Sequence, residues 1–171
     1  MRPNFLHKLD ALARHLTPFA LTLLLTLLNI VPLGVPALDA VTPLLSLMAV
    51  YHWAIYRPSL MPVVAVFIIG LLQDILAGPH LGVNALVFSM VYWAILAQEK
   101  FFIGKSFAIV WLGFGIVAGG AFALSWLLNS LLTLHILQFE PVVFQYLMTL
   151  ACFPILSWLF LRWQQAFLKE A

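Results

Sequence analysis

The stretch RPSLMPVVAVFIIGLLQDILAGPHLGVN, from Arg57 to Asn84, decides the fold of this chain. After a basic residue and a proline, an almost wholly apolar run extends from Leu60 to Leu76. A five-residue turn follows at Gly78–Gly82, and apolar sequence resumes at Val83. This order predicts a membrane hairpin with one carboxylate, Asp74, about one helical turn before the bend. Because charged side chains are rare within membrane segments, Asp74 is a candidate functional residue.

The composition of the 171 residues is that of an integral membrane protein. Hydrophobic residues make up 64% and charged residues only 8%, against roughly a quarter charged in an ordinary soluble domain. We therefore predict an all-α membrane protein, with one membrane domain over residues 1–171 and no second domain. The net charge of +2 gives no indication of nucleic-acid binding, and the single cysteine, Cys152, cannot form an internal disulfide.

Residues 1–15 form an amphipathic segment before the first apolar run. Leucine and phenylalanine recur there at helical spacing, while the charged residues lie elsewhere. We predict a helix in the lipid interface, with Asn4 as its N-cap and Pro18 ending it before the first span. A docking helix for a cytoplasmic partner is the alternative. We expect no cleavable signal peptide, because the following apolar run is long and no small-residue cleavage site ends it.

Six apolar segments follow as membrane spans of one helical bundle, and the links between them are short. Their ranges are 16–35, 41–56, 60–77, 83–97, 107–134 and 142–163. The second has only sixteen residues and contains His52, so we expect it to be tilted or irregular. The fifth has twenty-eight residues, about 42 Å of helix, and must tilt or protrude. Pro154 predicts a kink in the sixth.

The positions of lysine and arginine predict the orientation in the membrane. With six spans and both termini in the cytoplasm, all eight Lys and Arg fall on the cytoplasmic side, as the positive-inside rule requires. The outer links, near Asp39, near His80 and from His135 to Glu140, contain none. Five tryptophans lie toward the inner ends of the spans, as interfacial anchors do: Trp53, Trp93, Trp111, Trp158 and Trp163.

Asp74 is placed to close the bend of the hairpin. Gly70 lies one turn earlier on the same helix face and lets a neighbouring backbone come close. The first amides of the next helix lack helical acceptors, so Asp74 is expected to accept hydrogen bonds from Gly82–Asn84, from the Asn84 side chain, or from His80. A structural role is favoured over ion or proton handling, because a relay would need more ionisable groups than the distant His52.

A G-x-x-x-G pair lies in the fifth span at Gly115 and Gly119, and Ala123 extends it at the same spacing. Small residues at this spacing let helices pack closely. We expect packing within the bundle, with a docking groove for a partner's membrane helix as the alternative. Asn129 and Ser130, near the outer end, are candidates for a hydrogen bond between helices.

No catalytic or metal-binding pattern is present in the sequence. The histidines are scattered, without a H-x-x-x-H pair or a His/Cys/carboxylate cluster, so we expect no metal site and no cofactor. A G-x-S-x-G elbow and a P-loop are missing as well. Glu99, Glu140 and Glu170 are not placed to share a proton with another carboxylate. We therefore predict a protein that is not an enzyme.

The hairpin region resembles the signature of the MreD family, small integral membrane components of the bacterial rod-shape machinery. The residues that carry the resemblance are Tyr51, Trp53, Pro58, Gly70, Leu71, Leu72, Asp74, Ile75, Leu76, Gly78, Leu81 and Gly82. The specific likeness covers roughly residues 43–90. Val66 stands where the family pattern has glycine, and Gln73 is more polar than that pattern. The candidate hairpin motif consists of Pro58, Gly70, Asp74, Gly78, Gly82 and Asn84.

The resemblance implies a non-enzymatic scaffold in the bacterial inner membrane. It implies binding to MreC and, through it, a link from MreB filaments to lateral peptidoglycan synthesis by a class B penicillin-binding protein and RodA. The implied fold is similar to the six-helix substrate-binding subunits of energy-coupling-factor vitamin transporters.

That fold likeness provides an alternative function, a vitamin-type binding subunit or small solute carrier. Such a protein needs an outward-facing pocket lined by polar and aromatic groups. The outer half of the chain offers eight of them: Asp39, His80, Asn84, Trp126, Asn129, His135, Gln138 and Glu140. A general assembly factor for another membrane complex is a third possibility, which composition does not separate from the first.

Overall fold

The structure of the chain is a computed structural model that describes residues 5–29, 42–102 and 104–167. All regular structure in this described part is helical. The helices are α1 Phe5–Leu28, α2 Leu45–Tyr56, α3 Val63–Ala77, α4 Val83–Ala97, α5 Glu99–Phe102, α6 Phe107–Thr133 and α7 Glu140–Phe167, with a 3-10 turn η1 at Pro58–Leu60.

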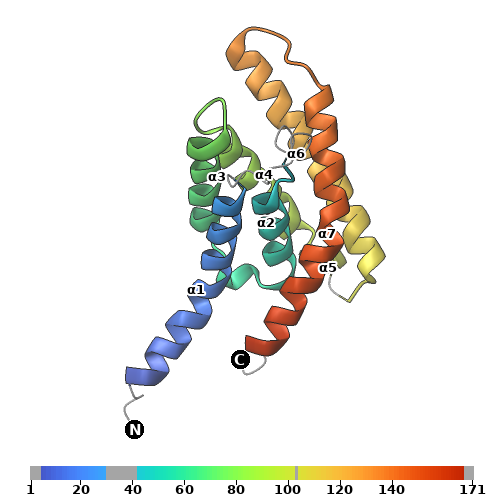
Figure 1. Cartoon of the computed structure of the whole chain (residues 1–171). Helices are drawn as coiled ribbons and strands as arrows, with labels where there is room; N and C mark the ends of the chain where they lie inside the picture. Colours follow the sequence, from blue (N-terminus) through green and yellow to red (C-terminus); the bar gives the residue numbers. More distant parts are fainter. Residues whose placement is uncertain (1–4, 30–41, 103, 168–171) are drawn as a thin grey trace.

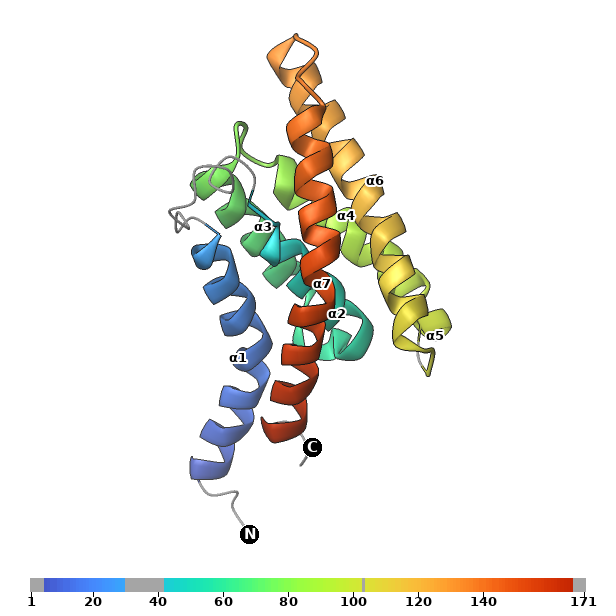
Figure 2. The same ribbon diagram turned by 45° about the vertical axis from the view of Figure 1, so that its right-hand side comes forward.

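The helices alternate in direction and form two groups (Figures 1 and 2). In the first, α3 and α4 form a tight hairpin, and α2 packs against both α1 and α4. In the second, α6 and α7 run antiparallel and pack on α4 and α2. The alternation gives the bundle two ends, and the links of the chain are divided between them.

Those two ends differ in charge. One, here the basic end, contains the start of α1, the α2–α3 link, α5 and the end of α7. The basic residues of the described links and helix ends beyond α1 lie there: Arg57, Lys100, Lys105 and Arg162. The other, here the turn end, contains the Gly78–Gly82 turn and the α6–α7 link, which have no lysine or arginine. This charge division is the one that the sequence predicts for the two sides of the membrane.

Two helices are long and apolar enough to cross a membrane by length and composition, Phe107–Thr133 and the Glu140–Gln165 part of α7. Three shorter apolar helices accompany them, Leu16–Leu28, Val63–Ala77 and Val83–Ala97. The predicted fourth span coincides with α4, and the third begins later than predicted because Pro58 starts the 3-10 turn. Six complete membrane crossings remain a prediction.

The segment predicted as the second span contains a short helix that is packed in the core of the bundle. α2 has only 12 residues, about 18 Å at 1.5 Å per residue, against a hydrocarbon core of about 30 Å. Every residue from Ser46 to Ile55 is buried by neighbouring helices. Trp53 is 0% exposed, so the prediction that it anchors the chain at the membrane interface is wrong. An apolar sequence signals burial, and it does not distinguish burial in protein from burial in lipid.

Pro18 does not end the N-terminal helix, which is continuous from Phe5 to Leu28. The predicted break between an interfacial helix and the first span is therefore wrong. A proline removes one backbone hydrogen bond, a loss that membrane helices tolerate when side chains supply other bonds. The predicted N-cap Asn4 and the link around Asp39 lie outside the described residues.

An aromatic core fills the middle of the bundle beside α2. The Tyr51 and Phe114 ring centroids are 5.1 Å apart, and Phe114 stacks on Phe153 at 4.2 Å. Tyr51 also donates its hydroxyl to the Val110 carbonyl at 2.9 Å. A methyl group on Gly113 would lie 2.9 Å from that hydroxyl. Aromatic pairs of this kind contribute about 0.5–1.5 kcal/mol each beyond their buried area, so α2, α6 and α7 are held together firmly here.

Candidate functional site

Asp74 caps α4 from the neighbouring helix. Its carboxylate accepts hydrogen bonds from the amides of Gly82 at 2.9 Å, Asn84 at 2.9 Å and Ala85 at 3.1 Å. Gly82 is the N-cap of α4 and has no side chain to satisfy the first-turn amides, a task that Ser, Asp or Asn performs at most helix starts. The two bonds from Gly82 and Asn84 fall in the predicted range, and the one from Ala85 lies one residue beyond it.

These contacts explain how a carboxylate is accommodated among apolar helices. Asp74 is only 3% exposed. Hydrogen bonds to a charged acceptor are roughly twice as strong as neutral ones, and the start of a helix carries positive partial charge. Three amides and the α4 dipole together replace the water that the carboxylate loses on burial.

Gly70 allows α3 and α4 to come close enough for this capping, and Gly78 lets the chain turn away beside Asp74. A methyl group on Gly70 would lie 2.5 Å from the Ala85 Cα, so only glycine fits there without movement of the backbone. A methyl group on Gly78 would lie 2.8 Å from the Asp74 Cα. Gly82 has a left-handed backbone with φ +95°, which side-chain-bearing residues rarely adopt. The glycines of the hairpin motif are thus required by the backbone geometry of the hairpin.

Pro58 lies at the opposite end of the hairpin. The Tyr92 hydroxyl of α4 donates to the Pro58 carbonyl at 3.1 Å. This bond ties the basic end of α4 to the α2–α3 link.

His80 contacts α6 instead of Asp74. Its Nδ1 atom is 3.1 Å from Oδ1 of Asn129, and the Nδ2 atom of Asn129 donates to the Ser125 carbonyl at 2.9 Å. Neither His80 nor the side chain of Asn84 bonds Asp74 among the described residues, so these two alternative expectations are wrong. The His80 contact connects the hairpin turn to the α6–α7 pair.

A proton relay through Asp74 has no support in the placement of the buried histidine. His52 is bundle-facing and 1% exposed, and it lies toward the basic end of α2 while Asp74 lies at the turn end of α3. Its ring is packed between Tyr56 and Phe160, with centroids 4.6 and 4.9 Å away. Within the described residues, no group of three His, Cys, Asp or Glu side chains could hold a metal ion.

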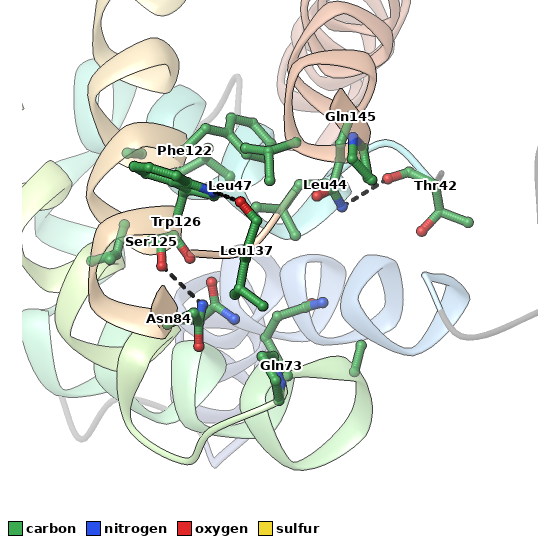
Figure 3. Close-up of a pocket in the computed structure, with 18 of the residues that line it drawn as sticks. Thr42, Leu44, Leu47, Gln73, Asn84, Phe122, Ser125, Trp126, Leu137 and Gln145 are labelled. Atoms are coloured by element: carbon green, nitrogen blue, oxygen red, sulfur yellow. Dashed lines mark hydrogen bonds between the residues drawn. The ribbon is translucent and has the colours of Figure 1, made fainter. Parts of the chain in front are cut away.

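A cavity of about 600 Å³ lies beside the hairpin turn. It is lined by residues of α2, α3, α4, α6 and α7 and of the links beside them, and Figure 3 shows Gln73, Asn84, Trp126 and Gln145 around it. Of the polar residues predicted for an outer pocket, Asn84, Trp126, Asn129 and Gln138 line it, whereas His80, His135 and Glu140 do not.

Sequence reasoning missed five polar residues of this lining: Asn29, Thr42, Gln73, Ser125 and Gln145. The unusual polarity of Gln73 beside Asp74 was the one available signal. Gln145 reaches the site through a hydrogen bond to the Thr42 carbonyl at 3.0 Å, across 103 residues of sequence. No local sequence pattern predicts a contact between residues so far apart in the chain.

The small residues of α6 face α7, as expected for packing within the bundle. The Tyr146 hydroxyl donates to the Gly115 carbonyl at 3.1 Å, and a methyl group on Gly119 would lie 3.8 Å from the same ring. Ala123 is exposed and takes no part. Beside this contact is a groove of about 250 Å³ lined by Trp111, Leu112, Gly115, Ile116, Tyr146 and Leu150.

Comparison with known proteins gives one result. The family model described as rod shape-determining protein MreD matches residues 10–170, which include the hairpin, the cavity and the α6–α7 groove. No curated protein and no solved structure matches the chain.

Proposed function

Because the chain belongs to the MreD family of rod shape-determining proteins, we propose that it is a non-enzymatic membrane scaffold of the bacterial elongation machinery. Its proposed task is to bind MreC and, through it, to link MreB filaments to lateral peptidoglycan synthesis by a class B penicillin-binding protein and RodA. The family and the long apolar helices make it a membrane protein with a role in rod-shape determination. The named partners belong to the proposal.

The observation that carries the proposal is the groove between α6 and α7. Leu112 and Ile116 border it and are 64% and 79% exposed. In a bilayer such a face meets either lipid or another helix, and close packing around small residues favours a helix. The described links between helices are short, so a partner's contacts fall mainly on helix faces. We propose that the single membrane helix of MreC occupies this groove.

The same proposal includes the topology. Residues 1–171 form one membrane domain in the inner membrane, with the basic end and both termini in the cytoplasm. The clustering of lysine and arginine at the basic end supports this orientation. The likeness of the fold to energy-coupling-factor subunits stays a prediction.

Co-purification from membranes in a mild detergent tests the partner. The chain carrying Ile116→Trp, which places a bulky ring over the groove, should recover at least tenfold less MreC than the unchanged protein. Ile75→Trp is the matched control, because Ile75 is an exposed isoleucine on α3, away from the groove. Equal loss of MreC with both variants, or with neither, would contradict binding in the α6–α7 groove.

A small-molecule-binding transporter subunit is the second candidate function, and the cavity beside the hairpin turn favours it. The volume of about 600 Å³ lies within the range of about 300–1,000 Å³ of small-molecule sites. The same co-purification distinguishes the two functions. Recovery of an ATPase module in place of MreC would support the transporter and contradict the scaffold.

A further inference from the structure

The cavity beside the hairpin turn concentrates one kind of chemical group. The chain has only ten asparagine and glutamine residues. Six of them line this cavity, from the end of α1, from α3, α4, α6 and α7, and from the α6–α7 link: Asn29, Gln73, Asn84, Asn129, Gln138 and Gln145. In an otherwise apolar chain, carboxamides from six separate places thus meet in one cavity.

Among the described residues, the lining contains no charged side chain and no histidine. The nearby carboxylate of Asp74 is not part of it and is already bound to three amides of α4. A charged ligand would therefore give up part of its water without gaining a counter-charge from these residues, which is unfavourable. The cavity favours a neutral ligand.

In three of these carboxamides, only one of the two polar groups, the oxygen or the NH₂ group, is hydrogen-bonded within the protein. Oδ1 of Asn29 accepts from the Leu45 amide at 3.4 Å, and Oε1 of Gln73 accepts from Ser46 at 3.1 Å. Their NH₂ groups have no partner among the described residues. The reverse holds for Gln145, whose NH₂ group is bonded to Thr42 and whose oxygen remains available.

Two more carboxamides are wholly uncommitted. Within the described part of the chain, the side chains of Asn84 and Gln138 make no hydrogen bond. Since a carboxamide carries both donors and an acceptor, the lining presents a mixture of both. A ligand with many hydroxyl or amide groups would satisfy it.

Aromatic residues complete the lining. Trp126, Phe88 and Phe122 contribute rings, and the indole of Trp126 is fixed by a hydrogen bond to the Leu137 carbonyl at 3.0 Å. Aromatic rings provide apolar surface beside the polar groups. A sugar ring has this dual character, with hydroxyl groups at its edge and C–H groups on its faces.

We propose that the cavity binds a neutral saccharide, either as a free sugar or as the headgroup of a glycolipid. The volume fits a site of this kind. The inference is independent of the scaffold role, because the proposed partner groove lies on the outer face of α6 and α7 and shares no lining residue with the cavity.

The test uses the full-length chain in phosphatidylcholine nanodiscs, extracted in a detergent without a sugar headgroup so that no maltoside competes. Isothermal titration with N-acetylglucosamine should give saturable binding. Glucosamine and glucuronate, cationic and anionic sugars of similar size, should bind at least tenfold more weakly. No saturable binding of N-acetylglucosamine or of a glycolipid, or equal binding of the charged sugars, would overturn the proposal.

Two variants localise the site. Asn84→Ala and Gln138→Ala each remove an uncommitted carboxamide and should weaken binding about threefold to tenfold, the effect of one hydrogen bond. Asn84→Ala retains the backbone amide that Asp74 needs. Gln98→Ala is the matched control, because it removes an exposed carboxamide at the other end of α4 and should not change the affinity. Saturable binding that is equal in all three variants would place the sugar elsewhere and overturn the proposal.

A further arm identifies the source of the sugar. Nanodiscs containing a monoglucosyl diacylglycerol present the same chemistry on a lipid. If this glycolipid binds and competes with the free sugar in a manner that depends on Asn84, the saccharide is a lipid headgroup. If only the free sugar binds in that manner, the ligand is soluble, and both results support a saccharide site. Occupation by phosphatidylcholine that the sugar cannot displace would overturn the proposal.

Discussion

Gly70 of α3 and Ala85 of α4 lie at a close approach of the two hairpin helices. A methyl group on Gly70 would lie 2.5 Å from the Ala85 Cα and 2.7 Å from its amide nitrogen. One turn further along α3, Asp74 accepts a hydrogen bond from that same amide at 3.1 Å. The glycine thus sets the spacing at which the carboxylate reaches the start of α4, and the two residues act as one structural unit.

Replacement of Asp74 should destabilise the fold. Asp74→Ala leaves three amides of the α4 start without their acceptor, at a cost of roughly 3 kcal/mol or more. That corresponds to a fall in melting temperature of roughly 6–12 °C for a chain of this size. Thermal unfolding followed by size-exclusion chromatography in detergent measures it. A variant as stable as the unchanged protein but inactive in rod-shape complementation would favour proton handling instead.

Gly70→Ala should destabilise the hairpin by about 1–3 kcal/mol, because its methyl group meets rigid backbone. Gly120→Ala is the matched control in a helix, since a methyl group there meets nothing within 4 Å. The control should be neutral or stabilising by up to about 1 kcal/mol from helix propensity. Equal melting temperatures for the two variants would mean that α3 and α4 do not come this close.

Gly82→Ala tests the left-handed backbone at the start of α4, where φ is +95°. An alanine there should cost about 1–2 kcal/mol even though space is available. Asparagine tolerates this conformation better, so Gly82→Asn should lie between alanine and glycine in melting temperature. The opposite order of the two variants would argue against the observed turn.

The contact between His80 and Asn129 should couple the turn to α6. A double-mutant cycle of His80→Ala and Asn129→Ala is expected to give a coupling energy of about 0.5–1.5 kcal/mol, the contribution of one hydrogen bond. Thermal unfolding of the four proteins supplies the numbers. Strict additivity would show that the turn end of the hairpin and α6 are independent.

The hairpin could be predicted in detail because its contacts are local. Asp74 and the amides it binds are eight to eleven residues apart, and the intervening turn residues restrict the geometry. At this short spacing, the glycines and the proline define the turn, and the carboxylate has the start of α4 within reach. The bounds of α4 were accurate for the same reason, since turn signals and apolar runs alternate sharply there.

The rest of the site depends on contacts that sequence patterns do not encode. The bond from Gln145 to Thr42 joins segments that are 103 residues apart, and the cavity arises only when five helices meet. The complete burial of α2 by other helices could not be predicted, because its apolar residues look the same whether protein or lipid covers them. Pro18 was mistaken for a helix end because a proline breaks most soluble helices, whereas helices in membranes tolerate it within their length.

The most direct test of the account is the sidedness of the two ends of the bundle. Cys152 is the one native cysteine, so Cys152→Ala provides a background for single cysteines at exposed positions, Lys105→Cys at the basic end and Ile136→Cys in the α6–α7 link. In intact spheroplasts, a membrane-impermeant maleimide should label the protein at position 136 and leave position 105 unlabelled until the membrane is opened. Labelling at position 105 from outside, with protection at position 136, would contradict the proposed topology and the scaffold that depends on it.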